Sequence, residues 1–285
     1  MHERMPLGAW MFRVGGRLWE TMDVTITAAH DSPGGRLPSV LFDLDGTLVD
    51  PAGGITGGIA HALAAVGLPV PGDEALSAMI GPKLADALVS IAGVPQERVP
   101  EVINAYRSWY AATGMDMSRV YPGVRELLAE LKARGHRLAV ATQKPEPLAN
   151  ALLAHHGIND CFDVIRGSHA DETLMPGEPG YRAGKSEIIA SALAGVSSLA
   201  ALGGSPNTVP GSVREAVMVG DRHQDVHGAR RNGLDCIGVS WGFAPDGELA
   251  AAGAAAVVHS AAELGELLGL AAGPVAGREA VHGAV

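Results

Sequence analysis

Four residues with strand character, Ser39 to Phe42, end abruptly in two carboxylates, Asp43 and Asp45, before a glycine-threonine turn. Such an apolar run is typical of a strand buried on both faces, which belongs to a parallel sheet. Ligands of open parallel sheets bind outside the carboxyl ends of the strands. Because residues two apart on a strand point the same way, both carboxylates would lie at that edge, with Leu44 turned into the interior. Taken alone, the pair also fits a strand end with solvated acids. Other residues of the chain are needed to distinguish this interpretation from a functional site.

Short apolar runs alternate with helical patterns along most of the remaining chain. Further strands are predicted at 137–141, 162–165, 216–219, 236–239 and 255–258. Helices are predicted at 124–131, 145–156, 185–194, 225–232 and 261–268. Strand and helix in alternation imply a parallel sheet with right-handed crossovers. The sequence therefore predicts an α/β fold with a doubly wound, Rossmann-like parallel-sheet core.

The segment 53–118 interrupts this alternation, because it holds helical pieces separated by prolines and glycines and no convincing strand. At roughly 65 residues it is too long for a loop. We therefore expect a small α-helical cap domain, inserted just beyond the two aspartates, where it could exclude water from them. The α/β hydrolase core would then comprise residues 38–52 and 119–270.

Both ends of the chain differ from this pattern. Residues 1–37 are expected to be an N-terminal extension that forms a hairpin or is disordered. An alternative is that this segment results from a start codon assigned upstream of the one that is used. Residues 271–285 are rich in small residues and are expected to form a flexible tail.

Composition excludes some function classes. The formal net charge of -10 argues against a nucleic-acid-binding surface, which needs a basic face. Two cysteines are too few for a disulfide framework and suit a reducing compartment. No apolar stretch reaches the eighteen or so residues of a membrane helix. We expect a soluble, cytoplasmic protein without a nucleic-acid or membrane partner.

Other polar residues follow later strands or begin the helices after them. Thr142 ends the second strand, with Pro145 expected at the first helical position, so that a hydroxyl and free amides could bind an anion. Lys185 opens a helix, and Asp221 and Asp225 follow the strand at 216–219. Alone, Thr142 fits a helix cap and Lys185 a solvated lysine.

Three carboxylates that converge on one place repel each other unless a cation holds them. A small set of oxygen ligands suits Mg²⁺, which binds through one or two carboxylates, waters and a substrate phosphate. The histidines and cysteines lack zinc-site spacing, and the glycine pairs near residue 55 do not fit a nucleotide-binding P-loop. A serine-nucleophile elbow is also absent from the sequence.

The polar segments resemble, in order and spacing, the four motifs of the haloacid dehalogenase-like hydrolase superfamily. These motifs are Asp43-Leu44-Asp45-Gly46-Thr47, Thr142, Lys185 and Gly220-Asp221-Arg222-His223-Gln224-Asp225. The similarity is greatest to phosphoglycolate-phosphatase-like and nucleotidase-like members and covers about residues 38–270.

The resemblance implies a role for each aspartate of the first motif. Asp43 would be the nucleophile that forms an aspartyl-phosphate. Asp45 would be the general acid for the leaving alcohol and then the base for the attacking water. Both would take part in Mg²⁺ binding, Asp45 through its backbone carbonyl.

The other motifs would hold the phosphoryl group and the metal. The resemblance implies that Thr142 and Lys185 bind phosphoryl oxygens, helped by backbone amides near Leu44 and Gln143. It implies that Asp221 ligates Mg²⁺ and that Asp225 orients Lys185 or a metal-bound water.

The resemblance also favours hydrolysis over other chemistries of the superfamily. Dehalogenases lack an acid at the position of Asp45. Lys83, the one lysine of the expected cap, is compared with the Schiff-base lysine of phosphonatases and is expected instead to be a substrate-side anion contact or to face solvent. Arg107, Trp109 and Tyr110 are further candidates for specificity, each also compatible with packing or solvent. Gln143 stands where the superfamily usually has Ser or Asn.

The prediction is a Mg²⁺-dependent phosphatase that acts on a small-molecule phosphate ester. Phosphoglycolate, a nucleoside 5′-monophosphate and a sugar phosphate all remain open as substrates. Alternatives are a phosphotransferase or phosphomutase of the same superfamily, and a phosphate-binding regulatory protein without turnover.

Overall fold

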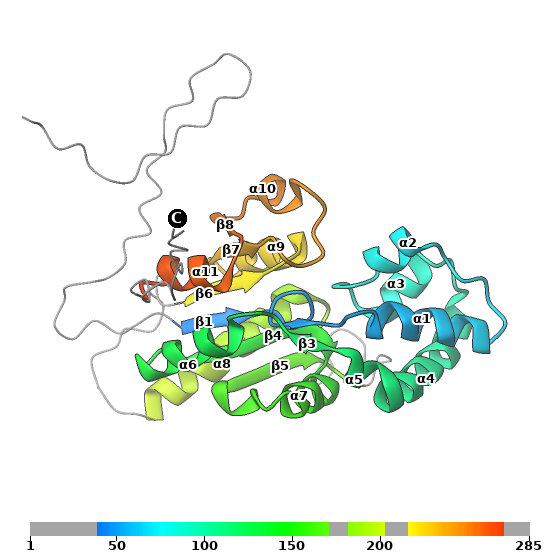
Figure 1. Ribbon diagram of the computed structural model, residues 1–285, viewed down its shortest axis with the longest axis horizontal. Coiled ribbons are helices and arrows are strands. Elements are labelled where there is room, and N and C mark those ends of the chain that lie inside the picture. Colours follow the sequence, from blue (N-terminus) through cyan, green and yellow to red (C-terminus); the bar gives the residue numbers. More distant parts are fainter. Residues whose placement is uncertain (1–38, 171–181, 203–215, 271–285) are drawn as a thin grey trace, which may run out of the picture.

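The computed structural model describes residues 39–170, 182–202 and 216–270, so the predicted N-terminal extension and C-terminal tail lie outside the described residues. A parallel sheet of six strands forms the centre of the molecule (Figure 1). Its order is β5 (Val164–Ser168), β4 (Leu138–Pro145), β1 (Ser39–Phe42), β6 (Ala216–Gly220), β7 (Asp235–Val239) and β8 (Ala256–Val258). The chain order changes direction between β1 and β6, and ligands bind at such a point in doubly wound folds.

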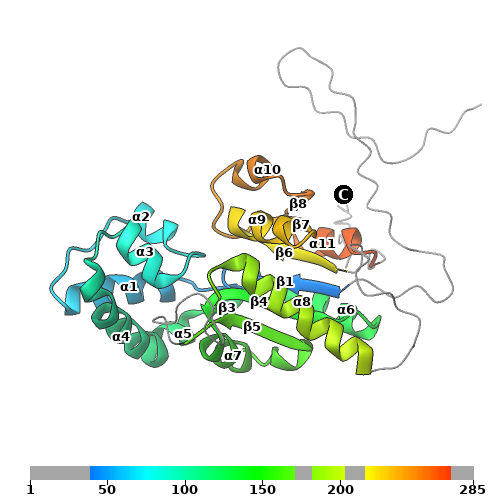
Figure 2. The same cartoon turned by 180° about the vertical axis from the view of Figure 1, so that it is seen from behind.

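Helices cover both faces of the sheet, which confirms the predicted α/β class. One face packs against α6 (Val124–Ala133), α7 (Glu146–His155) and α11 (Ala261–Leu267). The other packs against α8 (Lys185–Leu202), α9 (His223–Arg231) and α10 (Glu248–Ala252), and Figure 2 gives the view from the side of α8. Strand β1 supplies both layers, because Val40 and Phe42 point to the first face and Leu41 to the second.

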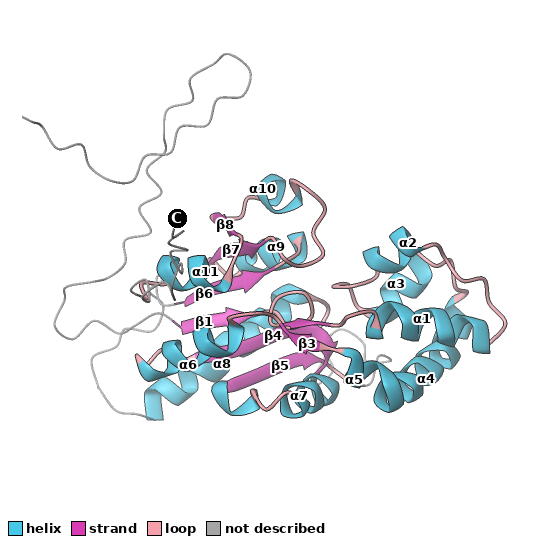
Figure 3. Ribbon diagram, viewed as in Figure 1, coloured by secondary structure: helices cyan, strands magenta, loops and turns pink. Residues whose placement is uncertain are grey.

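A separate helical region lies between β1 and β4, as the sequence predicts (Figure 3). It contains α1 (Gly54–Ala65), α2 (Asp73–Ala78), α3 (Leu84–Ser90), η1 (Gln96–Arg98), α4 (Val99–Trp109), the π-helical turn η2 (Tyr110–Gly114) and α5 (Met115–Met117). These helices bury an apolar core of their own. We call this region the cap; its exact domain boundaries stay a prediction.

Two short strands connect the cap to the core. Strand β2 (Val49–Asp50) leads into the cap and pairs antiparallel with β3 (Arg119–Val120), which leads out of it. Close to this connection, Gly54 lies against the backbone of Gly114, where an added Cβ would be 2.2 Å from the carbonyl oxygen. The two ends of the cap are therefore held side by side, and a side chain at Gly54 would force them apart.

The sequence-based boundaries need correction at two places. Pro145 is not the first residue of a helix: β4 extends to it through an irregularity after Ala141, and α7 begins at Glu146. Pro145 has extended dihedral angles, φ −51° and ψ 132°, so no helix start follows Thr142 directly. Helix α8 also continues to Leu202, past the end at residue 194 that the sequence predicts.

No described helix is both long enough and apolar enough to cross a membrane. The cytoplasmic location stays a prediction.

Candidate active site

Asp43, at the carboxyl end of β1, pairs with the first residue of α8. The ammonium of Lys185 lies 2.6 Å from Asp43 Oδ1 and 2.8 Å from Asp225 Oδ1. All three side chains are buried. Burial disfavours a charged lysine, but the carboxylates of Asp225 and Asp43 outweigh it and raise the pKa of Lys185. The structure thus brings together three of the predicted residues around one buried positive charge.

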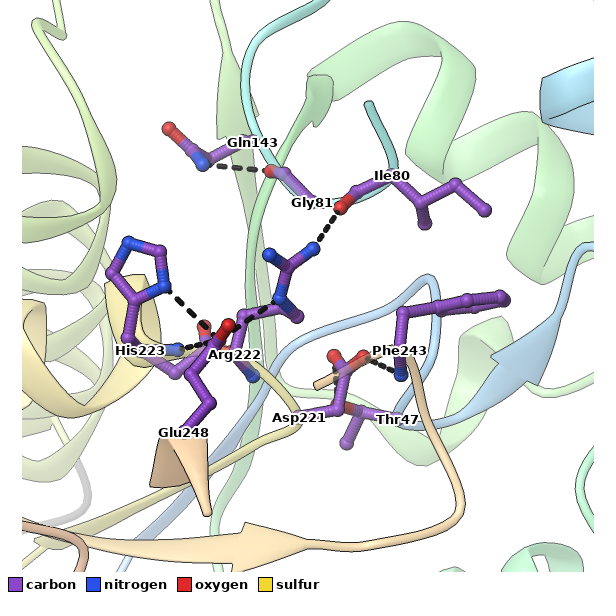
Figure 4. Close-up of polar contacts among 10 residues, drawn as sticks. Thr47, Ile80, Gly81, Gln143, Asp221, Arg222, His223, Phe243 and Glu248 are labelled. Atoms are coloured by element: carbon purple, nitrogen blue, oxygen red, sulfur yellow. Dashed lines mark hydrogen bonds and ion pairs between the residues drawn. The ribbon is translucent and has the colours of Figure 1, made fainter. Parts of the chain in front are cut away.

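Asp221, which follows the adjacent strand β6, completes a cluster of carboxylates. One oxygen each of Asp43, Asp221 and Asp225 lies within 4.8 Å of the others. Asp221 accepts hydrogen bonds from the Thr47 hydroxyl, at 3.2 Å, and from the Phe243 backbone N–H, at 2.8 Å (Figure 4). Neutral donors thus orient this carboxylate without compensating its charge.

The electrostatics of the cluster fit a bound cation. Burial, followed by the nearby carboxylates of Asp43 and Asp225, raises the pKa of Asp221 well above its ordinary value. Burial also raises the pKa of Asp225 to about 6, although Lys185 opposes the shift. One lysine facing three buried acids leaves negative charge uncompensated, and an oxygen-rich set of this kind suits a hard divalent metal.

Glycines around the cluster allow the backbone to approach the carboxylates. A Cβ on Gly46, whose φ is +90°, would lie 2.2 Å from Asp221 Oδ2. A Cβ on Gly242 would lie 2.3 Å from the Asp221 Cβ, and one on Gly220 would lie 2.2 Å from the Asp225 Cγ. Any side chain at these positions would displace the carboxylates from the cluster.

Asp45 has different surroundings from Asp43. Its Oδ2 accepts a hydrogen bond from the buried ammonium of Lys144, at 2.8 Å, and the same ammonium lies 4.7 Å from the ring centroid of Tyr110 in the cap. The other oxygen, Oδ1, is buried without a hydrogen-bond partner among the described residues. Asp45 is therefore oriented by one lysine, with one oxygen left for a ligand.

Lys144 was not among the predicted site residues. Burial alone would lower its pKa, but Asp45, with smaller contributions from Tyr110 and Tyr106, outweighs burial and raises it. One signal for it was present in the sequence: if the strand is taken to continue past Thr142, residues 142 and 144 point the same way. Because a helix is expected to start at Pro145, Lys144 is not predicted to lie on the same side of the strand as Thr142.

A cavity of about 60 Å³ separates the two aspartates from the cap. The core lines it with the polar residues Asp43, Asp45, Thr142, Gln143 and Lys144 and with Pro145 and Leu148. The cap contributes Ile55, Met79, Ile80, Gly81, Pro82, Leu84, Tyr106 and Arg107. Polar groups therefore gather on the core side of the cavity and mostly apolar groups on the cap side.

The predicted substrate residues lie at different places around this cavity. Thr142 is buried, and its hydroxyl accepts the Lys144 backbone N–H at 3.2 Å. Gln143 lines the cavity, but its amide nitrogen donates to the Gly81 carbonyl at 2.7 Å. Lys83 does not belong to the cavity lining and donates to the Arg182 carbonyl at 2.6 Å.

Two of the cap candidates pack rather than line the cavity. Tyr110 is fully buried in the cap core, and Trp109 stacks on the ring of His61 with 5.9 Å between centroids. Arg107 is a cavity residue and also donates to the Ala170 carbonyl at 3.2 Å.

Comparison with known proteins gives a consistent answer. The family model of the haloacid dehalogenase-like hydrolases matches residues 40–179, and a second hydrolase model of the same kind matches residues 183–264. The chain is 38% identical over 241 residues to the tyrosine-protein kinase PtkA of Mycobacterium tuberculosis, covering 84% of this chain and 75% of that protein. It is 39% identical over 216 residues to a 5′-nucleotidase of Pseudomonas aeruginosa, covering 76% of this chain and 88% of that protein.

Among solved structures, a protein described as a predicted phosphatase from Clostridium acetobutylicum superposes with a TM-score of 0.70 at 33% identity. The match covers 82% of this chain and 99% of that one. With the six-stranded core, the inserted cap and the buried acidic cluster, these similarities confirm the resemblance seen in the sequence. The chain belongs to the haloacid dehalogenase-like hydrolase superfamily and is a phosphatase-like hydrolase.

Proposed function

We propose that this protein is a Mg²⁺-dependent phosphatase that hydrolyses a small phosphorylated metabolite through an aspartyl-phosphate on Asp43. The observation that carries the proposal is the buried pair of Asp43 Oδ1 and the Lys185 ammonium, 2.6 Å apart, inside the carboxylate cluster. The pair places a carboxylate oxygen beside a cation at the edge of a cavity, where a nucleophile and a phosphoryl-binding group are needed.

In the proposed first step, an oxygen of Asp43 attacks phosphorus and the bond from phosphorus to the ester oxygen breaks. The leaving alcohol takes a proton from Asp45. Lys144 holds Oδ2 of Asp45, whereas Oδ1 has no hydrogen-bond partner among the described residues, so Oδ1 is the oxygen that carries this proton. Thr142 and Lys185 bind phosphoryl oxygens as charge gathers on them.

In the second step, water attacks the aspartyl-phosphate and gives its proton to Asp45. The bond from phosphorus to Asp43 breaks, inorganic phosphate leaves, and both carboxyl groups return to their first state. Asp43, Asp221, Asp225 and the backbone carbonyl of Asp45 would hold Mg²⁺, which would neutralise phosphoryl charge. The cap limits access of bulk water to the site.

The substrate is proposed from the relatives and from the cavity. A 5′-nucleotidase among the relatives supports a nucleoside 5′-monophosphate, while phosphoglycolate and sugar phosphates remain candidates. The cavity beside Asp43 and Asp45 would take the phosphoryl group, and the rest of the ester would lie against the cap residues that line it.

Release of inorganic phosphate from a panel of these three ester classes, with Mg²⁺ and with excess chelator, tests the proposal. We expect Mg²⁺-dependent release that Asp43→Asn reduces by at least about 10³-fold. Asp235→Asn is the matched control, since Asp235 is exposed at the amino end of β7, opposite the cluster. Background rates for wild type across the whole panel would refute the phosphatase.

A second function is transfer of the phosphoryl group to an alcohol or phenol instead of water. The similarity to a protein named tyrosine-protein kinase supports this alternative function. Added glycerol and a tyrosine-containing peptide should be recovered unphosphorylated if the protein is a hydrolase. Phosphorylation of either acceptor at the expense of free phosphate would assign it as a phosphotransferase.

A further inference from the structure

Two core side chains donate hydrogen bonds to the same loop of the cap. This cap loop, residues 79–83, connects α2 to α3 and supplies much of the apolar lining above the aspartates. Nη1 of Arg222 donates to the Ile80 carbonyl at 2.6 Å, and Nε2 of Gln143 donates to the next carbonyl, that of Gly81, at 2.7 Å (Figure 4). Two successive carbonyls of the cap loop thus accept hydrogen bonds from side chains at the ends of two different core strands.

The guanidinium of Arg222 is itself fixed in place. Its Nε donates to Oε1 of Glu248, at 3.0 Å, and the side chain is buried. The same Glu248 oxygen accepts the backbone N–H of His223, at 2.8 Å, so the carboxylate is anchored to the start of α9 (Figure 4). A planar guanidinium held at one edge presents its remaining donors in one direction, which here is the cap loop.

The backbone of the cap loop is shaped to meet this donor. Gly81 has φ +106°, a value that side chains rarely adopt, and a Cβ there would lie 3.2 Å from Arg222 Cγ. Close approach of Arg222 and exposure of the two carbonyls therefore depend on a glycine at this position.

The side chain of Arg222 is not required to start α9. The helix is capped by the Asp225 carboxylate, which accepts the Arg222 backbone N–H at 3.1 Å. That bond survives any substitution of the side chain except proline. The long side chain is therefore separable from the carboxylate cluster next to it.

We infer that Arg222, aided by Gln143, is a positioning residue that fastens the cap loop over the catalytic aspartates and thereby sets the closed, substrate-binding form of the cap. The inference rests on the proposed phosphatase only for its kinetic consequence. Loss of the fastening should loosen the cap loop and weaken substrate binding while the chemistry at Asp43 is retained.

Hydrogen exchange measured by mass spectrometry on a peptide spanning residues 79–84 tests the first consequence in the full-length protein. The amides of Met79 and Ile80 donate to the Leu76 and Ser77 carbonyls, so their exchange reports whether the loop is held. Arg222→Met should speed this exchange at least about tenfold, because hydrogen bonds from charged donors are among the stronger ones. Gln143→Met should speed it less, since its donor is neutral.

Arg230→Met is the matched control. Arg230 lies on the same helix, and its guanidinium also donates to a carbonyl, that of Ala252 at 3.1 Å, but this bond stays inside the core. Exchange in the cap loop should remain as in wild type. Equal exchange in Arg222→Met and Arg230→Met would overturn the inference, whatever the catalytic outcome.

Kinetics test the second consequence on the ester that wild type hydrolyses best. Arg222→Met should raise KM about tenfold with kcat changed less than about threefold, and Arg222→Lys, which retains one charged donor, should recover part of the KM. A fall in kcat without faster loop exchange would overturn the inference. If wild type hydrolyses no ester, the proposed phosphatase function is wrong. Hydrogen exchange in the cap loop still tests whether Arg222 holds that loop. Arg222→Lys also serves as the exchange variant should Arg222→Met not fold.

Discussion

The α/β core and the cap each enclose an apolar core, yet they carry polar groups in different ways. In the α/β core, the side chains of Asp43, Lys185 and Asp225 are buried against one another at the ends of strands and helices. Contacts between the two regions instead join side chains to backbone carbonyls. Arg222 and Gln143 of the core donate to Ile80 and Gly81 of the cap. Lys83 and Arg107 of the cap donate to Arg182 and Ala170. The buried charged cluster thus lies within the α/β core, whereas the position of the cap over it depends on hydrogen bonds between side chains and backbone carbonyls of the two regions.

This difference separates two kinds of substitution. Changes among the buried charges of the core should affect both chemistry and folding, because each charge compensates another in a poorly solvated place. Changes within the cap should affect access and local order.

The largest effect on folding is expected from Lys185→Met. Removal of the ammonium leaves Asp43 and Asp225 buried without their shared positive partner. The free energy of unfolding in urea, with chelator present, should fall by about 3–5 kcal/mol. Phosphate release should fall as well, since Lys185 would bind phosphoryl oxygens.

Lys132→Met is the control for that experiment. Its ammonium lies 3.0 Å from Asp163 Oδ1, but the lysine side chain is 34% exposed. Such a pair contributes at most about 1 kcal/mol. If Lys185→Met and Lys132→Met lower the free energy of unfolding by similar amounts, the buried cluster stabilises the core no more than an exposed ion pair does.

A second prediction compares two leucines, each 0% exposed, in the two regions. Leu128 on α6 packs in the α/β core, and Leu88 on α3 packs in the cap. Replacement of either by alanine should cost about 2–5 kcal/mol locally. Native-state hydrogen exchange should show lost protection in β1 and β4 for Leu128→Ala but only within 54–117 for Leu88→Ala. Lost protection in both regions for Leu88→Ala would make core and cap one cooperative unit.

A third prediction concerns the metal. Mg²⁺ at about 100 times its dissociation constant should raise the free energy of unfolding by about 2.7 kcal/mol. The melting temperature should therefore rise by several degrees in thermal melts at matched ionic strength. Asp221→Asn, which removes one charge from the cluster, should largely lose this shift. An equal shift in both proteins would place the binding outside the cluster.

How far the sequence predicts this molecule also differs between the two regions. Alternation of strands and helices identified the α/β core, and Asp43, Asp221 and Lys185 lie together because each follows a strand end or opens a helix. The position of each residue relative to its own strand or helix can be predicted locally. The parallel topology then brings the carboxyl ends of the strands to one edge of the sheet. Strands β2 and β3, with two residues each, are too short to produce a period and were not anticipated.

The contacts between core and cap could not be read from the sequence. Arg222 and Ile80 are 142 positions apart, and nothing in the pattern around either residue indicates that a guanidinium meets a carbonyl. Lys144 was missed for a different reason. Its side-chain direction depends on whether β4 continues past Thr142, and Pro145 favoured a helix start instead.

The smallest effect is expected at the exit of the cap, where His156, just after α7, contacts Ser118 of the cap with 2.8 Å between Nε2 and Oγ. Burial lowers the pKa of His156, and the nearby His155 and Arg125 add to the shift. Because the unfolded chain takes up a proton near pH 6.5 while the folded one resists it, stability should fall as the pH drops below that value. His156→Gln should retain a hydrogen-bonding group without titrating. The difference in unfolding free energy between the two proteins, measured from pH 7 to pH 5, should therefore narrow toward acid. A difference that stays constant would show that His156 does not couple the cap exit to pH.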